Sequence, residues 1–304
     1  MRRVAAYLQA GRVGHQFSQL FSARYFSELY KYEYLHTDFI DGEQWGDKAA
    51  IWNDFLQLGK DAPRLEDYIH WQPAIQVTRP LPPRPPSRLF EWQREHFDNI
   101  SRCVPDEWLL LFPDYGILWY DVYHWDREVF SRTADWFQRQ VFASRAYRAC
   151  PVIRNSAASK LRVVGYLRRG GNRGELPDPW YIPDDRFLSQ LWALRHQYGS
   201  RMGKPVVFSQ GPRETLTHPG WDAVDVHICD DEYPATFTAM KTCIEADIFV
   251  GSTGATTAMI RTLRHNRRVS LGVFKERTAS VYPDGPYIDR VGRLIEQEGE
   301  LCLP

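Results

Sequence analysis

The segment ADIFVGSTGATTAMIRTLR, residues 246–264, decides the fold class of this chain. Its apolar run at 248–250 predicts a short buried strand, and the residues from Thr256 to Arg264 have the spacing of a helix. Small and hydroxyl-bearing residues join the two, so we expect a turn that leads from the strand directly into the helix. A strand, a turn and a helix in this order are typical of a parallel α/β sheet.

The same alternation extends along the second half of the chain. Apolar runs of strand length alternate with longer segments of helical spacing, which is the pattern of βαβ units in a parallel sheet. We expect strands at residues 161–167, 205–208, 224–228, 248–250 and 269–271, and helices at 185–198, 236–245 and 256–264.

The first half opens in the same way but is less regular. A strand is expected within residues 4–8, a loop with Gly11 and Gly14 follows, and a helix runs to residue 29. Six prolines at residues 73–86 exclude a helix or a central strand there, which leaves a stiff connection, a loop that wraps one domain, or a proline-type peptide ligand. Further elements are expected at 32–35 and 108–112 as strands and at 89–104 and 126–148 as helices.

Length and composition indicate the number of domains, the classes of partner and the cellular compartment. A chain of 304 residues fits two domains, and the small polar stretch SAASK at 156–160 predicts their boundary, with domains at 1–155 and 156–304. Lys and Arg together number 38, as do Asp and Glu, so a broad basic surface for nucleic acid is excluded. The five cysteines have no paired spacing and no segment is apolar enough for a signal peptide or a membrane span, so we expect a cytoplasmic protein.

Two glycine-containing turns are candidates for phosphate binding. In AGRVGHQ, residues 10–16, Gly11 and Gly14 allow a ligand to approach the backbone at a helix start, although a purely structural turn explains them as well. The GxGxxG spacing of dinucleotide-binding proteins is missing. In VVGYLRRGGNRG, residues 163–174, Arg168 and Arg169 follow a buried strand beside two glycines, which favours a diphosphate clamp over the alternative of a solvated basic loop.

Other strand ends carry polar residues. In the turn at 252–257 we expect hydroxyls to cap the following helix and to hydrogen-bond phosphate or ribose oxygens. Ser209 and Gln210 end another expected strand, where a nucleotide base would lie. The acidic clusters at 184–185 and 230–232 are interpreted as helix caps or solvated turns, so no metal site is predicted. His15, Asp38, Asp41 and Glu175 are the candidates for a catalytic base.

Three segments resemble those of fucosyltransferase-like enzymes, including protein O-fucosyltransferases and α-1,2- and α-1,6-fucosyltransferases. GRVGHQ is similar to their GRxGNQ segment, YLRRGG to their HxRRGD segment, and ADIFVGSTGATTAMIR to their late strand–turn–helix segment. The resemblance implies a GT-B fold with two Rossmann-like domains facing a cleft, and a metal-independent, inverting transferase that uses a GDP-sugar. His15 replaces the family's Asn, Tyr166 its His and Gly171 its Asp.

The sequence therefore predicts a glycosyltransferase that moves a sugar, fucose from GDP-fucose first of all, to a glycan or another hydroxyl acceptor, without a cofactor. Alternatives are the same fold with another nucleotide sugar, a protein that binds sugar nucleotides or carbohydrate without catalysis, and a Rossmann-type oxidoreductase. The expected catalytic residues are Arg168 and His15, and the expected donor-binding residues are Gly11, Gly14, Arg169, Ser209, Gln210, Ser252, Thr253, Thr256 and Thr257.

Overall fold

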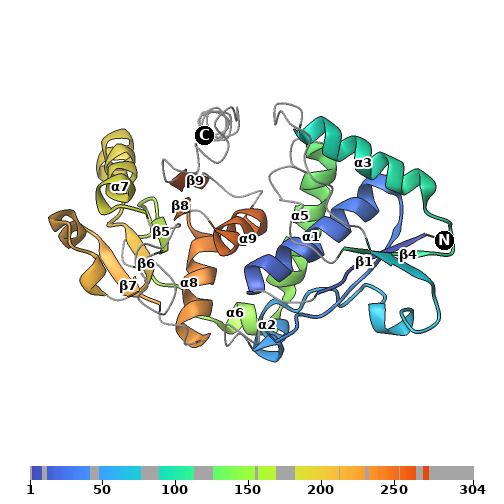
Figure 1. Cartoon of the computed structure of the whole chain (residues 1–304). Helices are drawn as coiled ribbons and strands as arrows, with labels where there is room; N and C mark the ends of the chain where they lie inside the picture. Colours follow the sequence, from blue (N-terminus) through green and yellow to red (C-terminus); the bar gives the residue numbers. More distant parts are fainter. Residues whose placement is uncertain are drawn as a thin grey trace. The chain divides into compact units, whose positions relative to one another are not determined.

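The computed structural model of the chain contains two units, Met1–Arg148 and Ala149–Pro304 (Figure 1). They divide a few residues before the expected boundary between 155 and 156. Each unit is built on its own parallel sheet with helices. The structure describes residues 2–8, 12–41, 48–76, 89–112, 126–154, 157–168, 182–211, 213–229, 233–252, 254–264 and 270–273.

The first unit is organised around a parallel sheet with the strand order β2-β1-β4-β3. The apolar run of β4 is buried throughout, as expected for a strand with neighbours on both sides. β3, which lies within the proline-containing stretch, is at the sheet edge and pairs with β4. Residues 77–88 lie outside the described part, so the expectation for them stays a prediction. The strands are β1 (Arg3–Ala6), β2 (Glu33–Leu35), β3 (Ala74–Gln76) and β4 (Leu109–Phe112).

Aromatic side chains pack the helices of this unit together. The rings of Phe17 and Phe137 have their centroids 5.0 Å apart, and those of Phe21 and Phe130 lie 5.1 Å apart, which holds α1 against α5. Leu65, in the short 3-10 helix η1 (Leu65–Asp67), packs with Ala5, Leu35, Leu109 and Leu111 of the sheet. The helices are α1 (Val13–Tyr30), α2 (Ala49–Leu56), α3 (Leu89–Cys103), α5 (Arg127–Ala143) and α6 (Arg145–Ala149).

The expectation of one long helix at 126–148 is wrong, because the helix breaks at Ser144. This residue has φ −59° and ψ 130°, and its hydroxyl donates a hydrogen bond to the carbonyl of Phe55 at 2.7 Å. The same oxygen accepts the backbone N–H of Tyr147 at 3.2 Å, which starts α6. Ser144 therefore ends α5 and caps α6. Serine is a preferred N-cap residue, because its hydroxyl can accept a backbone N–H of the helix that follows.

The second unit contains a five-stranded parallel sheet with the order β7-β6-β5-β8-β9. All five strands predicted for this half are present within one or two residues of their expected ends, so the α/β interpretation is confirmed. The strands are β5 (Val163–Arg168), β6 (Val206–Gln210), β7 (Asp225–Ile228), β8 (Ile248–Ser252) and β9 (Ser270–Val273).

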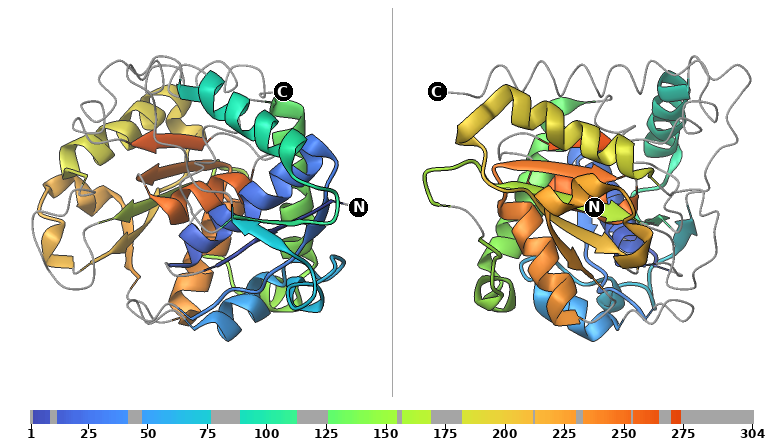
Figure 2. Two further views of the ribbon diagram at one scale, coloured as in Figure 1. Left: turned by 45° about the vertical axis from the view of Figure 1, so that its right-hand side comes forward. Right: turned by 90° about the vertical axis from the view of Figure 1, so that its left-hand side faces the viewer.

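Helices pack on both faces of this sheet (Figure 2). A side chain at Gly165 of β5 would collide with Phe187 of α7, whereas one at Gly251 of β8 would collide with Thr257 of α9. The two glycines therefore mark the places where the helices approach the sheet most closely. The helices are α7 (Asp184–Tyr198), α8 (Tyr233–Glu245) and α9 (Ala255–Leu263), with 3-10 helices η3 (Gly199–Arg201), η4 (Arg213–Thr215) and η5 (Pro219–Ala223). None of the described helices is long and apolar enough to cross a bilayer.

Candidate functional site

The strand order of the second sheet identifies its ligand-binding edge. From β5 the chain moves outward through β6 to β7, and it then crosses back to place β8 and β9 on the other side of β5. In open parallel sheets, ligands bind beyond the carboxyl ends of the strands at the point where the order reverses. Here that point lies between β5 and β8, the strands that end with Arg168 and Ser252.

Arg168 and Ser252 are held together at this edge. The backbone N–H of Arg168 donates to the Ser252 hydroxyl oxygen at 3.1 Å, and Ser252 is buried while Arg168 is partly exposed. On its other side Arg168 pairs in register with Gln210 of β6. The backbone of Arg168 is thus fixed by both neighbouring strands, so its guanidinium projects from a rigid base.

The start of α9 lies directly beside the Arg168 side chain. Gly254 is the N-cap residue, with φ 145°, and a Cβ atom built on it would be 3.8 Å from Arg168 Nη1. The N-cap residue is a glycine and has no side chain that could cap the helix, and Thr253 lies outside the described residues, so the expectation that a hydroxyl of the 252–257 turn caps α9 stays a prediction. The helix N-terminus and the guanidinium together place two positive groups at one spot, which is the electrostatic requirement for holding an anion.

Thr256 and Thr257 of the turn at 252–257 differ in exposure. Thr257 is buried, and its methyl group packs so closely that a Cβ atom at Gly251 would be 2.3 Å from it. Thr256, in the first turn of α9, is partly exposed. Thr257 is therefore part of the helix–sheet packing in this structure, and Thr256 is the threonine that a ligand can reach without rearrangement.

β6 brings two further expected residues to the same edge. Ser209 pairs in register with Leu167, and its hydroxyl is buried without a hydrogen-bond partner among the described residues. Gln210 is partly exposed at the strand end. On the edge strand β7, His227 Nε2 lies 3.3 Å from Asp225 Oδ2, and its ring packs on Phe208. The carboxyl edge of the sheet thus presents polar side chains at the ends of three neighbouring strands. They are Gln210 of β6, Arg168 of β5 and Ser252 of β8.

In the first unit, the expected residues lie at the start of α1. His15 is partly exposed in the first turn, whereas Gly14 is a buried helix residue and not a loop residue as expected. The reason is that α1 already begins at Val13. Gln16 of the same segment hydrogen-bonds both the N–H and the carbonyl of Ile40, each at 2.9 Å, and so ties α1 to the chain that follows β2.

Comparison with known proteins rests on structure alone. No protein-family model and no curated protein sequence matches the chain. A crystal structure of POFUT1 in complex with GDP aligns with a TM-score of 0.50 and 14% identity over 90% of this chain and 98% of that chain. The chain has a GT-B-like fucosyltransferase fold. A structure of POFUT1 in complex with GDP-fucose gives the same TM-score, with 13% identity over 90% of this chain and 97% of that chain.

The fucosyltransferase fold was expected from three short segments and is confirmed over 90% of the chain. A structure of NodZ α-1,6-fucosyltransferase soaked with GDP-fucose also matches, with 12% identity, 86% of this chain and 93% of that chain covered, and a TM-score of 0.46. Identity at this level shows the fold and leaves the roles of individual residues to be argued from the site. Gly11, Arg169, Gly171, Glu175 and Thr253 lie outside the described residues.

A buried histidine in the first unit escaped the sequence analysis. His36 follows β2 directly, and its ring nitrogen Nδ1 lies 3.0 Å from the Tyr34 hydroxyl. The pKa of His36 is lowered to about 4, chiefly by burial and also by the nearby Arg64 guanidinium, while Asp38 opposes the shift. The signal that was available is Gly59, whose φ of 69° and missing side chain leave the space that the imidazole fills.

The carboxylates considered as bases or metal ligands have other roles in this fucosyltransferase fold. Asp38 accepts a hydrogen bond from Arg64 at 2.6 Å, and Asp41 accepts the N–H of Ala49 at the start of α2. Asp184 accepts the N–H groups of Thr217 and His218 and so fixes the chain before η5. Within the described ranges, no three His, Cys, Asp or Glu side chains gather in a way that would hold a metal ion. Residues 230–232 lie outside these ranges.

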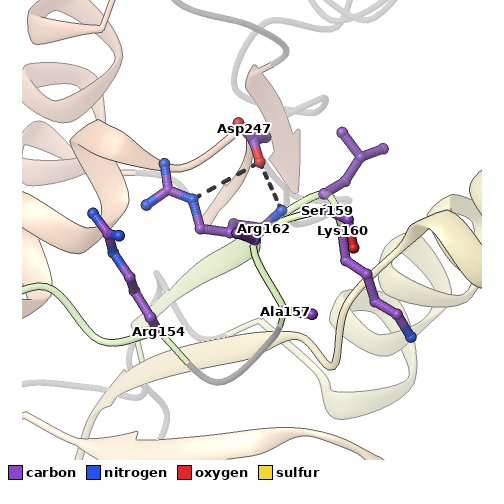
Figure 3. A pocket seen from close by; sticks show the side chains of 8 residues that line it. Arg154, Ala157, Ser159, Lys160, Arg162 and Asp247 are labelled. Carbon is purple, nitrogen blue, oxygen red and sulfur yellow. Dashed lines mark hydrogen bonds and ion pairs between the residues drawn. The ribbon is translucent and has the colours of Figure 1, made fainter.

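A hollow of about 370 Å³ lies at the opposite edge of the second sheet, where β5 and β8 begin (Figure 3). Arg162 and Asp247 line it and are bound to each other, with the N–H of Arg162 2.8 Å from the carboxylate. Ligands of open parallel sheets bind at the carboxyl edge, so we place the functional site at Arg168 and not in this hollow.

Proposed function

We propose that the chain is a glycosyltransferase that transfers fucose from GDP-fucose to a hydroxyl group of a glycan or another acceptor. The observation that carries the proposal is the Arg168 guanidinium beside the start of α9, at the switch point of a parallel sheet. A fixed fork of donors at a helix N-terminus is suited to the two phosphates of a nucleotide sugar.

The reaction defines what this site must do. The acceptor oxygen forms a bond to the anomeric carbon while the bond from that carbon to the β-phosphate oxygen breaks, and the electron pair leaves with GDP. Negative charge therefore grows on the β-phosphate in the transition state. Arg168 and the N–H groups of the first turn of α9 would stabilise that charge, which is the task that a bound divalent cation performs in metal-dependent transferases.

The acceptor hydroxyl also loses a proton. His15 is our candidate for the group that takes it, because it is partly exposed in the first turn of α1, next to the carboxyl end of β1. Histidine is the side chain that most often acts as a general base in enzymes. Asp38 and Asp41 are already bound to Arg64 and to the start of α2, which makes them weaker candidates.

Fucose and GDP are proposed as the donor components because the matching structures are fucosyltransferases, and those of POFUT1 hold GDP or GDP-fucose. One observation supports another nucleotide sugar as second candidate. Tyr166, which replaces the family's histidine, is a large buried side chain in β5, two residues before Arg168. A bulkier group there would alter the shape of the site close to the sugar.

The test combines binding with turnover. We expect GDP to raise the melting temperature more than UDP or CMP does, because a ligand at 100 times its Kd stabilises the folded state by about 2.7 kcal/mol. GDP-fucose should then release GDP in proportion to fucosylated acceptor, or more slowly to water. Stabilisation by GDP without release in the presence of a broad acceptor panel would support the non-catalytic alternative, and stabilisation only by UDP or CMP would contradict the proposed donor.

A further inference from the structure

One aromatic side chain of the first unit is presented openly to solvent. Trp71 is 64% exposed, and Ile75 at 41% is the other large apolar side chain that the described residues expose. Trp71 lies just before the edge strand β3, at the amino-terminal edge of the first sheet. The start of α1 with His15 lies beyond the carboxyl end of β1, so this tryptophan is separate from the proposed catalytic edge.

The indole is held in one orientation. Its Nε1 donates to the carbonyl of Asp67 at 2.7 Å, and its ring lies 5.5 Å from the ring of Tyr68. The Arg3 guanidinium lies 4.4 Å from the Tyr68 centroid and 6.0 Å from the Trp71 centroid. A side chain fixed in this way loses little conformational entropy when a ligand packs on it.

Arg3 is itself anchored, which makes the support rigid. Its Nε donates to Glu33 at 2.7 Å and its Nη1 to Gln72 at 3.1 Å. Gln72 is buried and donates in turn to the carbonyl of Glu107 at 2.7 Å. The indole therefore packs on Tyr68 and Arg3, and Arg3 is itself held at the amino ends of β1, β2 and β4.

The size and surroundings of this surface decide what fits it. A stable protein interface buries about 800 Å² on each partner, whereas one tryptophan offers about 150–250 Å². That area matches a single sugar ring. The C–H face of a pyranose is apolar and packs on an aromatic face, while its hydroxyls project sideways and need polar partners. Exposed side chains at Glu66, Asp67 and His70, in the same turn, can supply these.

We infer that Trp71 is a stacking platform for a pyranose ring of an oligosaccharide, at a site separate from the one that binds the nucleotide sugar. Such a site would retain a polymeric or branched glycan on the protein. The inference goes beyond the proposed transfer reaction and does not depend on it, because a carbohydrate can bind here whether or not the chain transfers fucose.

The test measures oligosaccharide binding to the full chain with and without saturating GDP, because binding at Trp71 should not depend on whether the nucleotide site is filled. The probes are cellohexaose, chitohexaose and xylohexaose, which present flat pyranose faces, and binding is followed by ligand-observed NMR. We expect one or more of them to bind the wild-type chain with Kd values of about 1 mM. Trp71→Ala should weaken that binding at least about tenfold, and Trp71→Phe should retain a large part of it.

Ile75→Ala is the matched control. It removes the neighbouring exposed apolar side chain but leaves the indole, so sugar binding should stay within about twofold of wild type. Equal losses in Trp71→Ala and Ile75→Ala would show that the indole has no special part in sugar binding and would overturn the inference. It would also be overturned if no probe bound the wild-type chain at about 10 mM, or if Trp71→Ala bound as wild type does. GDP stabilisation should be the same in all three variants, which separates this result from the test of the transferase.

Discussion

Arg168→Lys is the most informative perturbation of the proposed site. Lysine keeps the positive charge but replaces a planar fork of donors with a single ammonium group. The backbone should not move, since it is fixed by the pairing with Gln210 and by the bond from the Arg168 N–H to Ser252. Any loss of activity then reports on the guanidinium itself.

The magnitude follows from where the guanidinium lies. A Cβ atom built on Gly254 would be 3.8 Å from Arg168 Nη1, so Arg168 and the start of α9 would contact the same diphosphate. A charge-assisted contact of this kind is worth about 1.5–3 kcal/mol in the ground state. A donor that stabilises developing negative charge is worth about 2.7–4 kcal/mol, which corresponds to a 10²–10³-fold loss of kcat on its removal. We therefore expect kcat to fall about 10²-fold, with a smaller rise in donor KM.

Arg162→Lys is the control, because this arginine immediately precedes the same strand at its other end. Its guanidinium donates to the carbonyl of Glu245 and its Nε lies 3.8 Å from Asp247. Losing these contacts should lower the melting temperature, while kcat should stay within about twofold of wild type.

The assay is GDP release at saturating GDP-fucose and acceptor, with circular dichroism to establish folding. If Arg168→Lys folds normally and turns over at nearly the wild-type rate, the assignment of Arg168 is wrong. If both lysine variants lose activity in parallel with stability, the loss is structural and the reasoning about the diphosphate fails as well.

Three further predictions follow from the packing, the buried histidine and the charge at the site. Gly251→Ala should lower the free energy of unfolding by about 1–3 kcal/mol in denaturant titrations and raise the donor KM, because the new Cβ would lie 2.3 Å from the Thr257 methyl group. The neutral His36, whose pKa is lowered to about 4, contributes stability that is fully present above pH 6.5 and is lost as the pH falls toward 4. Wild type should therefore lose about 3 kcal/mol more than His36→Gln over this range, and parallel pH profiles would contradict the buried neutral imidazole. Transfer should persist in EDTA, and rescue of an EDTA-inactivated protein by Mn²⁺ would refute the role given to Arg168 and α9.

Local patterns predicted the elements well where each element is long or clearly apolar. The strands of the second sheet and the helix at residues 13–30 follow from periodicity and from the glycines between them. The break at Ser144 did not follow, because its cause is a hydrogen bond to Phe55, a residue far away in the sequence. The same applies to His36, whose burial depends on the space left by Gly59.

The sequence by itself determined that this chain forms parallel α/β sheets and that Arg168 and Ser252 lie close after the apolar runs of two strands, because side-chain periodicity and turn chemistry are local properties. Only the tertiary structure decided that those two strands are neighbours and that Arg168 lies beside Gly254. It also decided that Thr257 is packed inward and that Trp71 is held open to solvent. Strand order and side-chain exposure depend on contacts between residues that are distant in the chain. Local sequence patterns do not specify which segments form these contacts.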